Sequence, residues 1–299
     1  MRFGLALSGG GIRGATHIGV LKALEEEGLK PSWIAGTSAG SIVAGLYSYG
    51  LSPQEMEDIA IDLRGKYIDL NLSGLALGLG QWLIGKEPST DGIVKGKAIE
   101  KYLKKLTGSV NIKDIHMPLA IPAVDINRAQ TVIFINRLPR TPAKENRTIY
   151  INNVCLYKAI RASIAIPVIF KPMILDGRRL VDGGVTDNLP VEILKNMGAE
   201  RVIGVDLGYN GQLRREVDNL IEIGSQGLDI MAYQITSLKS QGADFIIRPG
   251  IYDVAIRDTE MLIGCIDRGY NVAQENMKRI KSAINSSYPT PFFYTVQRL

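Results

Sequence analysis

The first fifty residues alternate short apolar strands with glycine-containing turns and apolar helices, and this alternation restricts the fold more than any other feature. Two strand-like runs, 1–8 and 32–35, are each followed by a glycine turn and a helical pattern. In the first helix Ile18, Leu21 and Leu24 share one face. An opening of strand, helix, strand and helix is typical of a parallel sheet with helices packed on it.

The remainder of the chain continues this alternation. A helix is expected to begin at the capping box of residues 52–55, SPQE, and to end near Gly65. Further helices are predicted at 97–106 and about 270–284, and strands at 119–124, 131–135, 201–206 and 244–248, with a long helical stretch between the last two strands. The sequence therefore predicts an α/β protein with a largely parallel sheet.

Length and composition favour a single globular domain. The chain has 299 residues, 45% of them hydrophobic, and no repeat or linker divides it, so we expect one domain over 1–299. Cys155 and Cys265 lack the spacing of a disulfide framework or a zinc site, which favours a reducing compartment. The first apolar run reaches glycines too early for a signal peptide. We expect a cytoplasmic protein and leave the oligomeric state open.

Residues 72–92 form the least regular segment, apolar and rich in glycine. Its apolar part, 72–85, is shorter than the roughly 20 residues that span a bilayer. We interpret 72–92 as an insertion that either forms an apolar flap in contact with a membrane or packs inside the protein. The net charge of +5 favours anionic surfaces, whereas scattered basic residues and 7% aromatic content argue against nucleic acid.

A glycine loop, GGGIRG at residues 9–14, follows the first strand and opens the first helix. It has the spacing of a dinucleotide-binding turn, but the second strand runs into Gly36, Thr37 and Ser38 without the required acid. It also approximates a phosphate-binding P-loop, but Ala15 stands where lysine is needed. The two remaining interpretations are a tight packing turn and a set of backbone N–H groups that binds negative charge, as an oxyanion hole would beside a nucleophile.

A second glycine-flanked turn, GTSAG at residues 36–40, lies between a short strand and an apolar helix. This is the context of a GxSxG nucleophile elbow, in which Gly36 and Gly40 permit the sharp turn around Ser38. Serine and glycine are also common in ordinary turns. The strand–turn–helix context nevertheless favours Ser38 as a catalytic nucleophile.

A serine nucleophile needs a base, and the sequence has only two histidines, His17 and His116. In α/β-hydrolases the catalytic residues follow the chain order serine, acid, histidine. Both histidines precede Asp182, the acidic candidate described below, so this order is impossible with Asp182. His17 remains a minor alternative base. A carboxylate at a strand end can take the proton instead. Asp182, followed by Gly183 and Gly184, is the leading candidate, whereas the nearby Asp176-Gly177 pair is interpreted as a structural hairpin turn.

Together, GGGIRG, GTSAG and the DGG of residues 182–184 resemble the three signature motifs of patatin-like phospholipases, in order and spacing. Further similarity lies at 162–167, 187–190 and 243–249, so the resemblance covers most of the chain. It implies a three-layer α/β/α sandwich and a Ser-Asp dyad without histidine. By this likeness Ser38 is the nucleophile and Asp182 the base.

The resemblance also assigns the oxyanion hole to the glycine loop, with backbone N–H groups around Gly10, Gly11 and Ile12 as donors. The loop as a whole comprises Gly9, Gly10, Gly11, Ile12, Arg13 and Gly14. Arg13 matches a basic position of the family and either meets a lipid phosphate or forms a surface ion pair. Gly184 departs from the alanine of many members, a mild change.

The function expected on these grounds is hydrolysis of fatty-acyl esters by a phospholipase A, lysophospholipase or esterase type of enzyme. Its substrates would be phospholipids, lysophospholipids or other acyl esters, with no metal or organic cofactor, no nucleic acid partner, and peripheral membrane contact left open. The alternative is a non-catalytic lipid-binding or regulatory protein on the same fold. Head group, chain length and positional preference are not specified by the sequence.

Overall fold

A computed structural model describes residues 2–62, 91–141, 147–208, 220–251, 253–254 and 259–286. In these ranges one mixed sheet has the strand order β5-β4-β3-β2-β1-β8-β9, and the hairpin of β6 and β7 joins it through β3. The strands are β1 (Gly4–Leu7), β2 (Trp33–Gly36), β3 (Leu119–Asp125), β4 (Gln130–Ile135), β5 (Thr148–Ile151), β6 (Met173–Leu175), β7 (Arg178–Asp182), β8 (Val202–Val205) and β9 (Phe245–Ile247).

Most pairs of neighbouring strands are parallel, as the alternation of strands and helices predicts. β1 pairs parallel with β2 and β8, β2 with β3, β8 with β9, and β4 with β5. The antiparallel pairs are β3 with β4, β3 with β7, and β6 with β7. Because β1, β2, β8 and β9 run in the same direction, the loops that follow them meet at one edge of the sheet, where ligands bind in open α/β folds.

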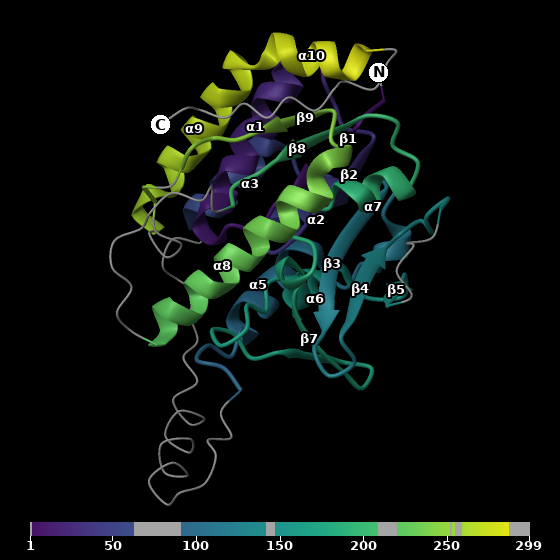
Figure 1. Cartoon of the computed structure of the whole chain (residues 1–299), viewed down its shortest axis with the longest axis vertical. Helices are drawn as coiled ribbons and strands as arrows, with labels where there is room; N and C mark the ends of the chain where they lie inside the picture. The colour runs from purple at the N-terminus through teal and green to yellow at the C-terminus, as the bar shows by residue number, and fades with distance from the viewer. Residues whose placement is uncertain are drawn as a thin grey trace, which may run out of the picture.

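Helices cover both faces of this sheet, and the alternation of side chains along the strands separates two cores. Leu5 and Leu7 of β1 join the larger cluster, whereas Ala6 joins the smaller one. The larger cluster contains residues of α1 (Thr16–Glu26), α2 (Ala39–Tyr49), α5 (Lys97–Thr107), α6 (Leu156–Ser163), α9 (Leu262–Glu275) and α10 (Met277–Asn285). The smaller contains residues of α7 (Val191–Asn196), and α8 (Leu220–Lys239) leads into the short helix η4 (Ser240–Gly242), which contacts α7. Figure 1 shows the arrangement of these helices around the sheet. The three-layer α/β/α arrangement is thus confirmed.

Helices α1 and α9 approach each other closely enough to require glycine at the crossing. A Cβ atom on Gly19 would come within 1.9 Å of the Ile266 carbonyl oxygen, and one on Gly269 within 2.1 Å of the Thr16 oxygen. The close contact buries α1 between the sheet and α9, so Ile18, Leu21 and Leu24 of the predicted face are at most 4% exposed. This packing fixes the helix that follows the glycine loop.

Several local predictions are confirmed and one is wrong. Ser52 and Glu55 form the capping box, with hydrogen bonds of 2.8 and 3.2 Å to each other's backbone N–H, at the start of α3 (Pro53–Asp62). The final helix predicted at about 270–284 is instead two helices, α9 and α10, the first of which begins at Leu262. They separate at Asn276, whose amide donates to the Val272 carbonyl at 2.9 Å and so competes with the helical ladder.

The expected flap or insertion at 72–92 lies outside the described residues except for its last two. Among the helices of the described ranges, none combines the length and the apolar character needed to cross a membrane. The expectation of a single domain over 1–299 stays a prediction.

Candidate active site

The site is centred on Ser38, which lies between the end of β2 and the start of α2. Its φ of 51° and ψ of −125° belong to a region that side-chain-bearing residues rarely adopt. The turn persists because neighbouring groups hold it: the Ser38 N–H donates to the Ser163 hydroxyl at 3.0 Å, and the Ser41 hydroxyl donates to the Ser38 carbonyl at 2.6 Å. The strained turn projects the side chain away from the strand, as a nucleophile elbow does.

Gly36 and Gly40 are required on either side of this turn because of close backbone contacts. A Cβ atom on Gly36 would lie 2.1 Å from the Gly40 carbonyl oxygen, and one on Gly40 would lie 2.5 Å from the Leu7 carbonyl oxygen. Side chains at these positions would push α2 away from the ends of β1 and β2. The two glycines predicted as elbow support are therefore needed because they have no side chain, which lets the neighbouring backbone segments pack in direct contact.

Asp182 reaches Ser38 because β2 and β7 share one side of β3. β2 pairs with Leu119 and Ala120 at the start of β3, and β7 arrives from the opposite direction, pairing through Asp182 with Ala123. The carboxyl ends of the two strands therefore meet at the gap between them. Pro122 stands at this gap, and because proline has no N–H, the break in pairing leaves no donor there unsatisfied.

The loop after Asp182 also needs glycine, because its backbone packs directly against that of β3. A Cβ atom on Gly183 would lie 2.4 Å from the Pro122 carbonyl oxygen, so only glycine fits. The Gly184 N–H donates to Oδ1 of Asp182 at 2.7 Å, which orients the carboxyl group. Oδ2 of Asp182 is buried and makes no hydrogen bond of standard geometry with another described residue. With no other donor among the described residues, this oxygen can accept a proton.

Burial determines the protonation of Asp182. Removal from water raises the pKa of its carboxyl to about 6, whereas the Ser38 side chain and the Gly184 N–H oppose the rise by stabilising the charged form. No cation pairs with Asp182 among the described residues. A carboxyl group with a pKa of this value accepts a proton more readily near neutral pH than an ordinary aspartate does.

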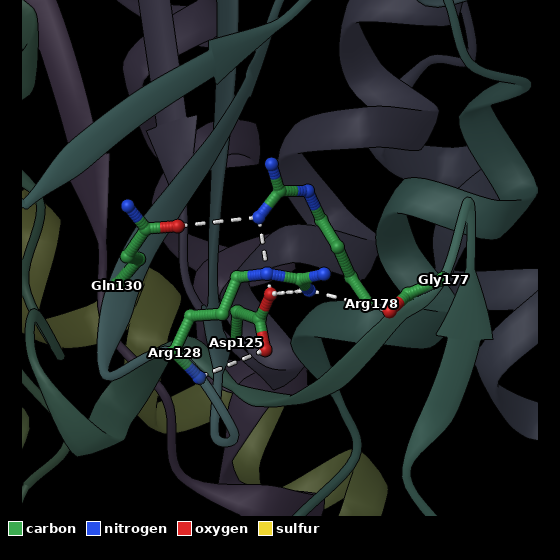
Figure 2. Close-up of polar contacts among 5 residues, drawn as sticks. All are labelled: Asp125, Arg128, Gln130, Gly177 and Arg178. Atoms are coloured by element: carbon green, nitrogen blue, oxygen red, sulfur yellow. Dashed lines mark hydrogen bonds and ion pairs between the residues drawn. The ribbon is translucent and has the colours of Figure 1, made fainter.

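A second buried carboxyl group, Asp125, lies on the neighbouring strand and has the opposite environment. Arg128 and Arg178 contact its Oδ2 at 2.8 and 3.0 Å, as Figure 2 shows. Burial alone would raise its pKa, but the hydrogen bonds from the two arginines outweigh that effect and hold the pKa below the usual value. Asp125 therefore stays ionised as part of a structural cluster.

Two of the glycine-loop residues offer unused backbone donors to the site. The short helix η1 (Gly11–Ala15) begins directly after Gly10, so the N–H groups of Gly10 and Gly11 have no partner within the helix. None is found for them among the other described residues, and both glycines line the pocket that holds Ser38 and Asp182. Ile12 precedes the first intrahelical donor as well, but it does not line the pocket.

The other predicted loop residues have different roles. The N–H of Gly9 donates to Asn188, at 3.3 Å to its carbonyl and 3.2 Å to its side chain, so it is already occupied. A Cβ atom on Gly14 would lie 2.5 Å from that of Ala39, which makes Gly14 the contact point between η1 and α2. Gly9 and Gly14 supply close packing.

Arg13 is buried, and the two roles considered for it, contact with a lipid phosphate and a surface ion pair, stay predictions. It is 5% exposed, and its Nε donates to the Val254 carbonyl at 2.9 Å. Its side chain lines the pocket while it holds the segment that follows β9. The local sequence gave no sign of this contact because Val254 is 241 residues away.

Neither histidine lies in the pocket. His17 is fully buried and its Nε2 bonds to the Ser8 carbonyl at 2.8 Å, and burial lowers its pKa to about 4. At neutral pH the ring is therefore uncharged and donates this hydrogen to Ser8, which fixes the end of β1. His116 is exposed and does not line the pocket. The geometry does not favour His17 as an alternative base.

Asp176 and Gly177 form the hairpin turn predicted for them. Both have positive φ, 47° and 69°, and they connect β6 to β7 as a two-residue turn. Asp176 is exposed, in contrast to the buried Asp182 at the other end of β7. The same Asp-Gly dipeptide thus occupies two different environments six residues apart.

The pocket is a cavity of about 160 Å³ with polar and apolar walls. Its polar lining includes Ser38, Asp182 and residues of the glycine loop, together with Arg248 and Asp206. The apolar wall comes from α8 and from the segment after α6, through Leu228, Met231, Ala232, Ile166, Pro167 and Ile169. Within the described ranges no three histidine, cysteine, aspartate or glutamate side chains gather as a metal site requires.

Sequence reasoning did not identify Ser163, Asn188 and Thr236 as residues of the site. Ser163 and Asn188 fall inside segments noted only for their family resemblance, and their partners lie more than 100 residues away. Thr236 lines the pocket from α8, is 5% exposed, and its hydroxyl has no hydrogen-bond partner among the described residues. No local pattern distinguishes these side chains from ordinary buried polar groups.

The model of the family described as patatin-like phospholipase matches residues 5–195. The chain belongs to this family. The matched range runs from β1 through α7, so it includes Ser38, Asp182 and the glycine loop and leaves out α8 and Arg248. Family membership supports lipid hydrolysis as the class of activity.

Named relatives agree with this membership. Lysophospholipase NTE1 of Mycosarcoma maydis is 29% identical over 208 residues, which cover 70% of this chain and 10% of that protein. An uncharacterised NTE family protein of Mycobacterium bovis is 33% identical over 206 residues, which cover 69% of this chain and 49% of the relative. The chain thus spans from a tenth to about half of the length of these two relatives.

Solved structures with a similar backbone have lower sequence identity to this chain than these relatives do. VipD from Legionella pneumophila has 13% identity and a TM-score of 0.48 over 93% of this chain and 67% of VipD. Human GIVD cytosolic phospholipase A2 has 10% identity and a TM-score of 0.47 over 94% of this chain and 58% of that one. Likenesses at this level carry no argument about the activity of this chain.

Proposed function

We propose that this chain is a serine lipid acyl hydrolase that uses Ser38 as nucleophile and Asp182 as general base. The observation that carries the proposal is the meeting of a strained serine turn with a buried carboxyl group whose pKa is raised to about 6, in a pocket without histidine. Membership of the patatin-like phospholipase family supports the same chemistry.

In the first half of the reaction, the Ser38 Oγ attacks the ester carbonyl carbon and its proton passes to the Asp182 carboxylate. The carbonyl electron pair moves onto its oxygen, where the N–H groups of Gly10 and Gly11 stabilise the negative charge. Collapse of this intermediate breaks the bond to the alcohol, which leaves with the proton from Asp182. An acyl-serine remains.

In the second half, water takes the place of the alcohol. Asp182 accepts a proton from the water as its oxygen attacks the acyl carbon, and the same donors stabilise the oxyanion. The Ser38 oxygen then leaves, recovers the proton from Asp182, and the fatty acid is released. No step of this proposed mechanism uses a metal or an organic cofactor.

The substrate class follows from the mixed character of the pocket. An acyl chain fits the apolar wall of Leu228 and Met231, and the polar wall leaves room for a head group near Arg248. Phospholipids, lysophospholipids and other fatty-acyl esters all combine these two parts, and the lysophospholipase relatives point to the same class. Peripheral membrane contact stays a prediction.

The test compares wild type, Ser38→Ala and Asp182→Asn for hydrolysis of lysophosphatidylcholine and of a p-nitrophenyl acyl ester. Asp176→Asn is the matched control, because it changes the other Asp-Gly pair of the same hairpin at an exposed position. We expect the first two variants to lose activity on both substrates and the control to keep it. Full activity of Ser38→Ala would refute the nucleophile assignment.

The same assay separates the proposal from a non-catalytic lipid-binding protein on this fold. In that case wild type would bind lysophosphatidylcholine without hydrolysing it, and Ser38→Ala would bind it equally well. Turnover by wild type that depends on Ser38 would exclude this alternative.

A further inference from the structure

Arg248 and Arg13 are the two cationic residues that line the described part of the pocket. Arg13 is buried and tied to the Val254 carbonyl, whereas the side chain of Arg248 is 41% exposed. Arg248 follows β9 directly, and so lies at the edge of the sheet where the carboxyl ends of the parallel strands meet. Of the two, Arg248 is the one that an incoming ligand can reach.

One edge of the Arg248 guanidinium is fixed by Asp206, which follows the neighbouring strand β8. The contact joins Nε of Arg248 to Oδ2 of Asp206 at 3.3 Å, and the Gly208 N–H donates to the other carboxylate oxygen at 3.1 Å. The terminal nitrogens of Arg248 make no hydrogen bond with any described residue. Within the described ranges, the four N–H donors on these terminal nitrogens are therefore unused and can meet a ligand.

Residues of α8 that line the same pocket make the site amphipathic. Leu228 and Ala232 of α8 supply apolar surface, and Thr236 on the same helix has a buried hydroxyl without a partner among the described residues. A buried hydroxyl without a partner is unfavourable, and a polar group of a ligand would satisfy it. A ligand with an apolar chain and an anionic, oxygen-rich part matches both walls.

We infer that Arg248 binds the phosphate group of an acyl phospholipid or lysophospholipid and selects phosphate-bearing esters over neutral ones. The guanidinium fork matches the geometry of phosphate oxygens and forms paired, charge-assisted hydrogen bonds with them. Asp206 would act as a positioning residue that orients the fork. This inference rests on the proposed function, because it places the phosphate beside the ester that Ser38 attacks.

The test measures kcat/KM for lysophosphatidylcholine and for the monoacylglycerol of the same chain length, which lacks the phosphate. Arg248→Gln removes the charge and keeps a planar hydrogen-bonding group. We expect it to lower kcat/KM about 10- to 100-fold for the lysophospholipid, the range of a charged hydrogen bond, and less than about twofold for the monoacylglycerol. Arg248→Lys should restore part of the loss, because it keeps the charge without the fork.

Arg268→Gln is the matched control. Arg268 has a side chain 38% exposed and an ion pair with Asp253, so it resembles Arg248 in both respects, but it does not line the pocket. Arg268→Gln should leave kcat/KM unchanged for both substrates. Equal losses for both substrates in Arg248→Gln, or no loss for either, would overturn the inference.

Binding measurements in the Ser38→Ala background keep this inference separate from the proposed function. Lysophosphatidylcholine below its micellar concentration should bind more weakly after Arg248→Gln even where no turnover occurs, and monoacylglycerol binding should not change. Glycerophosphocholine and inorganic phosphate serve as competitors that lack the acyl chain. If inorganic phosphate alone binds in an Arg248-dependent way and the lysophospholipid does not, Arg248 is an anion site unrelated to the lipid head group.

Discussion

Asp125 and Asp182 lie at the two ends of one short ladder between β3 and β7, and both are buried, yet their carboxyl groups behave in opposite ways. Asp125 pairs in register with Leu180, and Asp182 with Ala123. Two arginines contact Asp125 and hold its pKa below the usual value, whereas burial raises the pKa of Asp182 to about 6. The backbone setting is nearly the same, and the difference lies in the partners.

This comparison distinguishes a structural carboxylate from the one that we propose as the base. A buried carboxylate satisfied by cations is stable as an anion and has little tendency to take a proton. A buried carboxylate whose main partners are a backbone N–H and a serine hydroxyl retains that tendency and destabilises the fold when it ionises. Burial alone would not have distinguished the two residues. The charges around each one do.

The largest expected effect is on catalysis. Asp182→Asn should lower kcat/KM by about 10²- to 10⁴-fold, the usual contribution of a general base. Asp125→Asn, assayed at a temperature where it is fully folded, should stay within a few-fold of wild type. Steady-state kinetics on a soluble acyl ester measures both variants. Equal losses of kcat/KM in Asp182→Asn and Asp125→Asn would show that the partners of a buried carboxylate do not distinguish a catalytic base from a structural residue.

The next effect is the pH dependence of activity. Only the ionised form of Asp182 can accept a proton, so kcat/KM should rise about tenfold per pH unit below pH 6 and level off above it, given a pKa of about 6 in the free enzyme. Asp125→Asn should leave this midpoint unchanged, because Asp125 does not line the pocket. A midpoint near 4 in wild type would contradict the raised pKa of Asp182.

Stability should respond to the two residues with opposite signs. The folded-state pKa of Asp182 is raised from 3.8 to about 6, so its ionisation lowers the free energy of unfolding as pH rises through this window. Asp182→Asn should therefore be more stable than wild type at pH 8, by up to about 3 kcal/mol. Asp125 has a lowered pKa and contributes stability at neutral pH, which is lost as pH falls through its folded-state pKa.

Urea unfolding at pH 8 and at pH 4.5 measures both effects. Asp125→Asn should lose about 2 kcal/mol at pH 8, because it leaves the arginines without their carboxylate. A lower free energy of unfolding for Asp182→Asn than for wild type at pH 8 would contradict the claim that the ionised Asp182 carboxylate destabilises the fold.

The smallest effects belong to the arginines that satisfy Asp125. The side chain of Arg178 is 25% exposed and that of Arg128 is 50% exposed, so water screens the second ion pair more strongly. Arg178→Gln should cost about 1 kcal/mol of unfolding free energy and Arg128→Gln less than that. Thermal unfolding of the two variants gives the order, and the reverse order would show that exposure does not control these contacts.

The elements of the site that sequence predicts are those with local signals. The turn around Ser38 needs Gly36 and Gly40 a fixed number of residues away, and Asp182 precedes two glycines, so glycine spacing marks both positions. The histidine inventory indicates a carboxylate base, for which Asp182 is the leading candidate. These inferences require no knowledge of which distant segments touch.

Contacts across long sequence separations could not be predicted. Ser163 accepts the Ser38 N–H across 125 residues, and Asn188 occupies the Gly9 N–H across 179. Arg13, interpreted as a surface or ligand-binding residue, is buried against Val254. The break between α9 and α10 lies at Asn276, whose side chain bonds to the Val272 carbonyl, a contact that hydrophobic periodicity does not report. Packing, rather than local pattern, determines each of these.

The most direct test of the account is covalent labelling by a fluorophosphonate probe followed by peptide mapping of the labelled residue. Ser38 acting with Asp182 predicts that wild type is labelled on Ser38, that Ser38→Ala is not labelled, and that Asp182→Asn is labelled far more slowly while His17→Gln, assayed where it remains folded, reacts at nearly the wild-type rate. Labelling of Ser38→Ala, or loss of labelling in His17→Gln with Asp182→Asn unaffected, would contradict it.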